Sequence, residues 1–428
     1  MKEHKISLST AILLNMNIMI GSGILIGPGA SAAISGNASF LSWPLVALLF
    51  LPLVLCTIEL SRMFPGAGGF YLYARQGLNK TAGFAAGWLY IVGYTFAATV
   101  EVMALHNLVS KNFGHLAIVS NAPIFYALAT IAVFLFSLLS LKIVSKFLDS
   151  LTIVKILPLI ILILILPFIL NPSFTISGNE LSLLPASLAM PIFGYFGFEY
   201  CVGVSHLIKD TEKNAPRAIL FGFLGTALLY MLFHFGILNL MGAQNLAQIG
   251  APNFPNFITL PIPYLKTLLS ILIPAASAII FIASLIGMIN ANAILVQTFA
   301  KGNLFKGGSF LTATTSLGRP WAALMVQSLI VFIFACLIPT IDRAGGLCIL
   351  GVFLSFLLPF ISLLVVQKRN KSTGKMLITF FAIILVVLLS AYSWYVLCPA
   401  MAERMIYTLV LATVFVLGMS LFNKNGKD

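Results

Sequence analysis

The sequence is poor in charged residues. Asp, Glu, Lys and Arg make up only 8% of its 428 residues, and no long polar segment interrupts the chain. This scarcity argues against a separately folded soluble domain. Acidic residues are the rarest charges: 11 Asp and Glu stand against 24 Lys and Arg, a net charge of +13. Because the basic residues lie almost entirely in short segments between apolar runs, they indicate membrane orientation, not nucleic-acid binding.

Cysteine is scarce as well, and its spacing fits neither a metal site nor a redox motif. No nucleophile–base pair and no cluster of metal-ligating residues is apparent, so the sequence predicts neither an enzyme nor a cofactor. The cysteines lie in or beside apolar runs and are expected to be small core residues, without a disulfide framework. They are Cys56, Cys201, Cys336, Cys348 and Cys398.

Apolar residues dominate instead. They form 60% of the chain, the mean hydropathy is +1.06, and runs of about 20 residues recur from end to end. Such runs predict an all-α, multi-pass membrane protein forming one transmembrane domain, residues 1–428. We expect about twelve spans, near residues 8–34, 40–61, 82–109, 123–141, 147–170, 185–205, 217–242, 266–299, 320–339, 345–366, 374–397 and 403–422.

The distribution of basic residues supports this count. With twelve spans, 19 of the 24 Lys and Arg fall on one side and four on the other, and Lys155 remains inside a span. One missed span would invert every later loop and destroy the bias. The side rich in Lys and Arg is cytoplasmic, so both termini are predicted there, in a cytoplasmic (inner) membrane. Although Lys2 and Lys5 precede an apolar stretch as in a signal peptide, its length predicts an uncleaved first span.

Two spans are interrupted near their middle. The first contains Gly21-Ser22-Gly23-Ile24 after Asn17, and the sixth contains Phe193-Gly194-Tyr195-Phe196-Gly197-Phe198-Glu199. Broken helices at membrane depth are tolerated only where they face protein or a cavity, and paired breaks point to a transporter binding site. The breaks are five spans apart along the chain. Five is odd, so the second set must be inverted: repeat one covers about 8–170, repeat two about 185–366, and two extra helices about 374–422.

The two breaks have opposite polarity. At Gly21 to Ile24, freed N–H groups at the start of a half-helix favour a carboxylate, with Asn17 one turn earlier. Close helix packing at the glycines explains that motif equally well. At Phe193 to Gly197, freed carbonyls favour an ammonium group. Phe193, Phe196 and Phe198 offer an aromatic wall or gate, although most of the 35 Phe must face core or lipid. One carboxylate site and one ammonium site describe an α-amino acid.

These motifs resemble the amino acid–polyamine–organocation superfamily of permeases. The resemblance covers most of the chain and rests on four motifs in order. They are Gly21-Ser22-Gly23-Ile24; Glu59-Leu60-Ser61 with Phe64-Pro65-Gly66-Ala67-Gly68-Gly69-Phe70-Tyr71; Phe196-Gly197-Phe198-Glu199; and Lys213-Asn214-Ala215-Pro216-Arg217-Ala218. The resemblance implies a LeuT-type fold, with broken helices one and six, and substrate contacts from the backbone of both breaks.

Lys155 is an ionisable residue deep in the fifth span, so it is a functional candidate for proton coupling, with snorkelling to the membrane surface as the alternative. The resemblance places it where an amine replaces the sodium of related symporters, with the first-span backbone and Ser284 as partners, and makes Glu199 a gate carboxylate. Asn290 is either a pocket group or interhelical glue. Glu101, His106 and His234 have no assigned role; a metal or proton relay at Glu101 and His106 is disfavoured by their five-residue spacing.

The substrate class remains open at this stage. The segment from Gln297 to Phe305 resembles the basic amino acid and polyamine antiporter branch, but Phe193 and Met288 stand where guanidinium readers tend to carry tryptophan. No acidic residue is expected beside the pocket. The sequence therefore predicts an alternating-access transporter of neutral amino acids, coupled to protons or working by exchange. A basic amino acid or polyamine antiporter is the alternative, and a non-transporting amino acid sensor a remote one.

Overall fold

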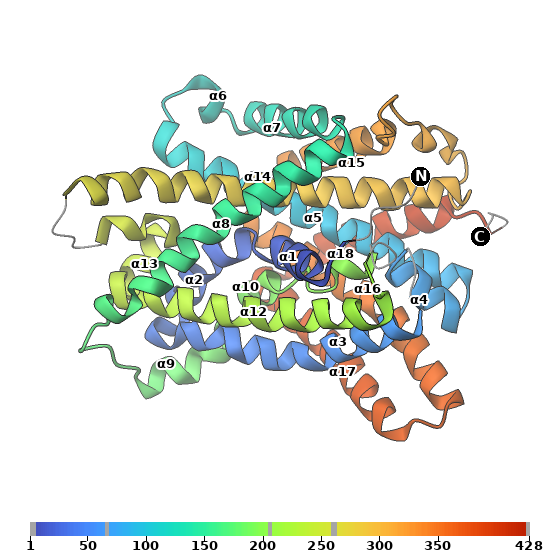
Figure 1. The fold of residues 1–428 in the computed structure, drawn as a ribbon, viewed down its shortest axis with the longest axis horizontal. Coiled ribbons are helices and arrows are strands. Elements are labelled where there is room, and N and C mark those ends of the chain that lie inside the picture. Colours follow the sequence, from blue (N-terminus) through green and yellow to red (C-terminus); the bar gives the residue numbers. More distant parts are fainter. Residues whose placement is uncertain (1–5, 65–67, 204–207, 258–262, 425–428) are drawn as a thin grey trace.

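The structure, a computed structural model, describes residues 6–64, 68–203, 208–257 and 263–424 (Figure 1). Within these ranges every named element is a helix, and the extended contacts are two isolated bridges, Ile6 with Ile208 and Phe305 with Phe422. The all-α class predicted from the apolar runs is therefore confirmed for the described residues.

Each expected span corresponds to a continuous or a broken helix. The first is α1 (Leu8–Met19) with α2 (Ser22–Ser35), and the sixth contains α10 (Ala189–Gly194) and α11 (Tyr200–Gly203). The continuous ones are α3 (Ser42–Met63), α5 (Lys80–Phe113), α7 (Ala122–Ser137), α8 (Leu141–Ile169), α12 (Thr211–Met241), α14 (Pro263–Lys301), α15 (Trp321–Leu337), α16 (Ile341–Arg369), α17 (Thr373–Leu397) and α18 (Met401–Leu421).

Fewer helices pass a strict test of length and hydropathy. Among the described residues, seven helical stretches are long and apolar enough to cross a membrane, or eight if a pair bent by 116° after Ser137 forms one span. Three further apolar helices, Leu8–Met19, Val154–Ile169 and Trp321–Leu337, are shorter. Breaks and bends divide apolar runs into pieces that fail this test singly. The structure thus describes a multi-pass membrane protein, and the count of twelve stays a prediction.

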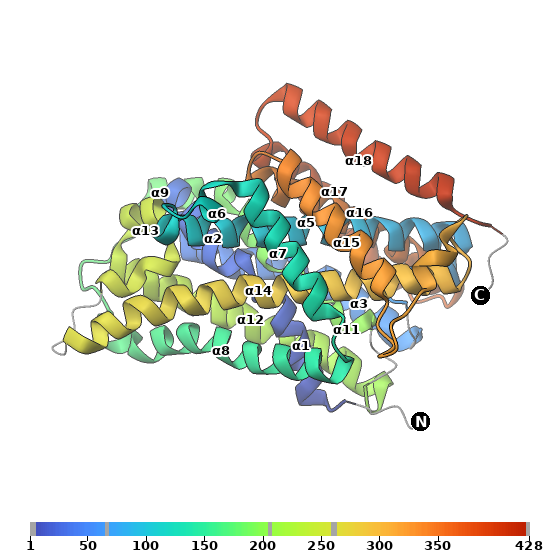
Figure 2. The ribbon, with the colours of Figure 1, turned by 90° about the horizontal axis from the view of Figure 1, so that it is seen from above.

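The core is built around α5. In the apolar part of Lys80–Lys111, 89% of the residues are buried, against 11% in Met401–Leu421. Helix α5 packs against α14 and α16, and α16 also packs against α17. Helix α18 lies along the outer edge of the bundle (Figure 2), with its apolar side chains facing outward. In a membrane this exposed apolar surface contacts lipid.

The broken helices lie inside the bundle. Helix α1 packs against α12, and α2 packs against α10, so the two breaks meet (Figure 1). Short helices form the connections: η1 (Gly36–Leu41), α4 (Phe70–Gly77), α6 (Ala117–Ser120), α9 (Gly178–Leu183), η2 (Leu184–Ser187), α13 (Ala243–Ile249), η4 (Ala251–Phe257) and η5 (Gly308–Thr312).

Polar side chains begin several helices by accepting otherwise unpaired N–H groups. Ser7 caps α1, Asn79 caps α5, and Ser177 with Glu180 forms a capping box at α9. Glu180 also accepts from the Asn37 N–H at 2.7 Å, which ties α9 to η1. Partial burial raises the pKa of Glu180, but the N–H groups of Ser177 and Asn37 outweigh it, and the net pKa lies below its ordinary value.

Candidate functional site

The first break is a two-residue gap between half-helices. Helix α1 ends at Met19, Gly21 is extended with φ −122° and ψ −150°, and α2 begins at Ser22. Any residue adopts this conformation, so glycine is not required for its backbone freedom. Space is the constraint, because a Cβ on Gly21 would lie 2.6 Å from Oε1 of Glu101.

Lys155 holds the end of α1. Its side chain is fully buried, and Nζ donates to the carbonyl oxygens of Asn17 and of Ile20, the latter at 2.8 Å. The Ser284 hydroxyl approaches the same Ile20 oxygen at 3.5 Å. The last carbonyls of a helix have no partner within it, and at membrane depth each must find one. The expected contact of Lys155 with the first-span backbone is thus present, and Ser284 joins it at Ile20.

Glu101 holds the start of α2, which the sequence analysis did not anticipate. Its Oε1 accepts from the Ser22 N–H and from the Ser22 hydroxyl, both at 3.0 Å. The side chain is 1% exposed, and no described residue lies within hydrogen-bonding distance of Oε2. Glu101 and Lys155 are close enough for their charges to interact. The first break is therefore held between an ammonium group and a carboxylate.

The second break touches the first. Helix α10 ends at Gly194, and Gly197 has φ +105°, a left-handed conformation that favours glycine. A Cβ on Gly23 would lie 2.6 Å from Cα of Gly194, so the two backbones approach as closely as glycines allow. The Tyr230 hydroxyl lies 2.5 Å from the Met19 carbonyl oxygen and 3.2 Å from that of Gly194. One tyrosine on α12 therefore joins both breaks.

Glu199 follows the second break and is buried. The Tyr94 hydroxyl donates to its Oε1 at 2.5 Å, and the Gly197 N–H donates to its Oε2 at 3.2 Å. Both carboxylate oxygens of Glu199 therefore have partners, whereas Oε2 of Glu101 has none among the described residues.

A cavity lies between the breaks. Most of its lining is apolar or backbone, and Glu101, Tyr94 and Cys348 are its ionisable groups. Such a lining suits a small ligand whose polar ends meet backbone and whose side chain is apolar. The lining residues are Ile18, Met19, Gly21, Gly23, Tyr94, Ala97, Glu101, Phe193, Gly194, Phe196, Met288 and Cys348.

The structure brings together part of the predicted substrate site. Gly21, Gly23, Phe193, Gly194 and Phe196 line the cavity. The other break residues are buried beside it, namely Asn17, Ser22, Ile24 and Gly197.

Asn290 lies elsewhere. Its Nδ2 donates to the Ser137 hydroxyl at 2.7 Å and to the Ile286 carbonyl oxygen, and Oδ1 accepts from Arg319. These contacts join α14 to the ends of α7 and α15, which is the interhelical role that the sequence left open.

The expectation of no acidic residue beside the pocket was wrong. Glu101 lines the cavity, and Glu199 binds the lining residue Tyr94. Sequence reasoning also missed Tyr230 and Cys348, because helix rotation within the bundle decides which residues of α12 and α16 face the breaks. Glu101 had one usable signal, since a carboxylate in a span is functional by default.

His106 and His234, the two histidines considered in the sequence analysis, are not part of the cavity lining. His234 accepts from Trp43 Nε1 at Nδ1, 2.9 Å, and its Nε2 lies 3.1 Å from the Ser39 hydroxyl. His106 Nε2 lies 3.0 Å from the Val119 carbonyl oxygen. Among the described residues no group of three His, Cys, Asp or Glu has the arrangement of a metal site.

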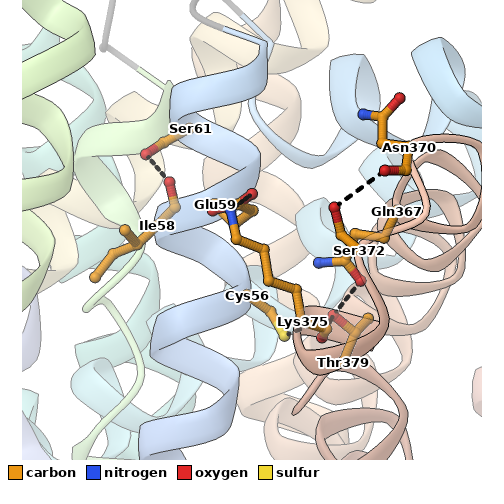
Figure 3. A network of polar contacts seen from close by, with 9 residues as sticks. All are labelled: Cys56, Ile58, Glu59, Ser61, Gln367, Asn370, Ser372, Lys375 and Thr379. Atoms are coloured by element: carbon orange, nitrogen blue, oxygen red, sulfur yellow. Dashed lines mark hydrogen bonds and ion pairs between the residues drawn. The ribbon is translucent and has the colours of Figure 1, made fainter. Parts of the chain in front are cut away.

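The motif after the second span is partly described. Glu59 on α3 forms an ion pair with Lys375 on α17 at 2.7 Å, beside a hydrogen bond from Thr379 to Gln367 (Figure 3). Pro65, Gly66 and Ala67 lie outside the described residues, and Gly68 and Gly69, with φ +109° and +51°, lead into α4. Its described residues therefore contribute to the contact between α3 and α17 and lie outside the cavity lining.

Most of the chain is similar in sequence to known proteins. A family model described as amino acid permease matches residues 6–417. The serine/threonine exchanger SteT of Bacillus subtilis is 23% identical, over 86% of this chain and 84% of its own. The aspartate-proton symporter of the same organism is 23% identical, over 87% and 75%, and the putrescine transporter PotE of Escherichia coli 26%, over 59% and 58%. Because the family model spans both breaks and nearly all of the sequence, the chain belongs to the amino acid permease family.

Proposed function

We propose that this permease carries small neutral amino acids across the cytoplasmic membrane by alternating access, through proton-coupled symport or exchange. The observation that carries the proposal is the contact of the two broken helices at one cavity. There the N-terminus of α2 suits a carboxylate, and the second break contributes carbonyl groups for an ammonium.

The preference for a neutral side chain follows from charge and lining. Lys155 balances Glu101, so the pair adds no net charge to the cavity. Phe193, Phe196 and Met288 then offer an apolar surface to the substrate side chain.

In this proposal the membrane arrangement is twelve spans in a LeuT-type inverted repeat. Repeat one is about 8–170, repeat two about 185–366, and the extra helices about 374–422. Both termini are cytoplasmic. In support, the bridges place Ile6 beside Ile208 and Phe422 beside Phe305. These partners follow the sixth and eighth expected spans, in loops that the charge distribution assigns to the cytoplasmic side.

Lys155 takes the role of a sodium ion in this scheme. Its ammonium binds the Asn17 and Ile20 carbonyl oxygens, groups that elsewhere coordinate a cation, and Ser284 completes the arrangement. Transport should therefore not require sodium. Glu199, bonded to the second break through Gly197, couples the inner gate to the substrate.

A basic amino acid or polyamine antiporter is the second candidate. Glu101 in the cavity lining favours it, since its Oε2 has no hydrogen-bond partner among the described residues and can accept from a cationic substrate. The similarity to PotE agrees with this alternative.

Reconstitution tests the proposal. The purified protein in proteoliposomes is offered radiolabelled serine, alanine, leucine, aspartate, arginine and putrescine, with and without a pH gradient, internal substrate or sodium. We expect saturable, sodium-independent uptake of a neutral amino acid that arginine and putrescine inhibit weakly. Strict sodium dependence would refute the role of Lys155, and best uptake of putrescine or arginine would establish the antiporter instead.

A further inference from the structure

The hydrogen-bond donors at the first break already bind a carboxylate of the protein itself, that of Glu101. Glu101 Oε1 accepts hydrogen bonds from both the N–H and the hydroxyl of Ser22, the first residue of α2. Those donors belong to the helix end at which the proposed function places the substrate carboxylate. Glu101 is also at the cavity wall, with Oε2 unpartnered among the described residues. A carboxylate entering the cavity therefore meets another one at its site.

The surroundings allow only one of the two to remain there as an anion. Helices α1 and α2 carry no ionisable side chain between residues 8 and 35. The charged group that faces Glu101 is Lys155 of α8, and its hydrogen bonds are directed at carbonyl oxygens of α1. Tyr230 of α12 and Cys348 of α16 also face Glu101, and both are neutral as hydroxyl and thiol. The ammonium of the substrate is directed to the carbonyl groups of the second break, so Lys155 is the cation that faces both carboxylates at the first break. One cation there does not compensate two buried carboxylates, so the second must leave or bind a proton.

Glu199 differs from Glu101 in this respect. Tyr94 and Gly197 donate to its two oxygens, whereas the donors of Ser22 bind Glu101. Because the proposed function also uses Glu199, at the inner gate, the matched control is Glu59 of α3, a carboxylate outside the cavity lining.

We propose that Glu101 is a tethered anion that occupies the Ser22 donors in the empty transporter and is replaced there by the substrate carboxylate. As Glu101 withdraws, its carboxylate takes one proton from solution and becomes a neutral carboxylic acid. The substrate carboxylate then accepts the Ser22 hydrogen bonds, and the charge near Lys155 is unchanged. This inference rests on the proposed function and identifies the residue that links one proton to one amino acid.

Linkage fixes the pH dependence. If binding takes up one proton, the apparent Kd of an amino acid rises about tenfold per pH unit above the range in which Glu101 binds its proton. Glu101→Gln is neutral at every pH, so its Kd should be flat and, at alkaline pH, lower than that of the wild type. An amine without a carboxylate, such as ethylamine, has no group with which to displace Glu101 and should not cause proton uptake.

The experiment uses the full-length protein in nanodiscs, with L-alanine, L-serine and L-leucine as probes and ethylamine as the control ligand. Infrared difference spectra record the C=O band of a protonated carboxyl group as ligand is added, and calorimetry gives Kd over a range of pH. We expect the band and the pH slope with the amino acids in the wild type and in Glu59→Gln, whose carboxylate lies outside the cavity lining. Glu101→Gln should bind the amino acids without either.

Three results would overturn the inference. The first is amino acid binding to the wild type with neither band nor slope, which needs no variant. The second is both signals persisting in Glu101→Gln. The third is loss of all binding in a Glu101→Gln protein that elutes as a monodisperse peak, which would make Glu101 a direct ligand for the ammonium. Failure of every amino acid to bind the wild type would refute the proposed function together with this inference, so the two failures are distinguishable.

Discussion

Replacing Lys155 with methionine tests how the first break is held. Methionine keeps most of the volume of lysine but removes the ammonium that binds the Asn17 and Ile20 carbonyl oxygens. Each hydrogen bond from a charged donor contributes about 1.5–3 kcal/mol to stability. The loss of these two bonds is partly offset, because Lys155→Met no longer buries an ammonium group. Removal of one member of a buried charge pair costs about 3–5 kcal/mol, since the other charge is left uncompensated. We expect Lys155→Met to lower the free energy of unfolding by about 3–5 kcal/mol.

A double-mutant cycle separates the charge interaction from the loss of the carbonyl contacts. Glu101→Gln removes the uncompensated charge, so Lys155→Met/Glu101→Gln should be more stable than Lys155→Met by about 1–3 kcal/mol. The assay is reversible unfolding in mixed micelles with increasing dodecyl sulfate, followed by the fluorescence of the four tryptophans. Lys146→Met, an exposed position on the same helix, is the control and should stay within about 0.5 kcal/mol of the wild type.

Two outcomes would refute this reasoning. If Lys155→Met were as stable as Lys146→Met, the ammonium would not be holding the break. If the two substitutions were strictly additive, Glu101 and Lys155 would not act as a pair.

The remaining predictions concern the contact between the breaks and one connection. In Gly23→Ala the new Cβ meets the Gly194 backbone, which cannot give way. The resulting strain of about 1–3 kcal/mol should reduce amino acid uptake about tenfold. The control is Gly225→Ala, whose Cβ has ordinary contacts at 3.8 Å, and it should transport normally. Tyr230→Phe leaves two buried carbonyl oxygens without the hydroxyl and should lower the free energy of unfolding by about 1–3 kcal/mol, measured in the same micelles; no change would mean that water replaces the hydroxyl. Glu180 has a lowered pKa in the folded state, so its contribution is present at neutral pH and lost as the pH falls through that pKa. Glu180→Gln should therefore be less stable than the wild type at pH 7 and equal to it in acid, and a deficit that persists in acid would contradict the assignment.

Much of the architecture could be predicted from the sequence, because a membrane restricts the choices. Apolar runs must be helices when no water can satisfy the backbone, and basic residues report sidedness. The positions of both breaks were also predictable, since glycines in the middle of a span mark where a helix ends. The contact of Lys155 with the first break was expected as well, as an implication of the resemblance to the permease superfamily.

The residues that face the cavity were less predictable. Glu101 and Asn290 look alike in the sequence, as one polar group within an apolar helix. Glu101 faces the first break, whereas Asn290 faces Arg319 and Ser137. A rotation of about 100° per residue separates these outcomes, and the packing of neighbouring helices sets that rotation.

The sequence by itself determined that the chain is an all-α membrane protein with two broken helices, since composition and glycine position are local properties. Only the tertiary structure decided that a carboxylate of α5 occupies the donors of α2, that Tyr230 joins both breaks, and that Gly23 must be small. Each of these depends on atoms far apart in the chain approaching within about 3 Å, a distance that local sequence does not encode and that helix packing sets.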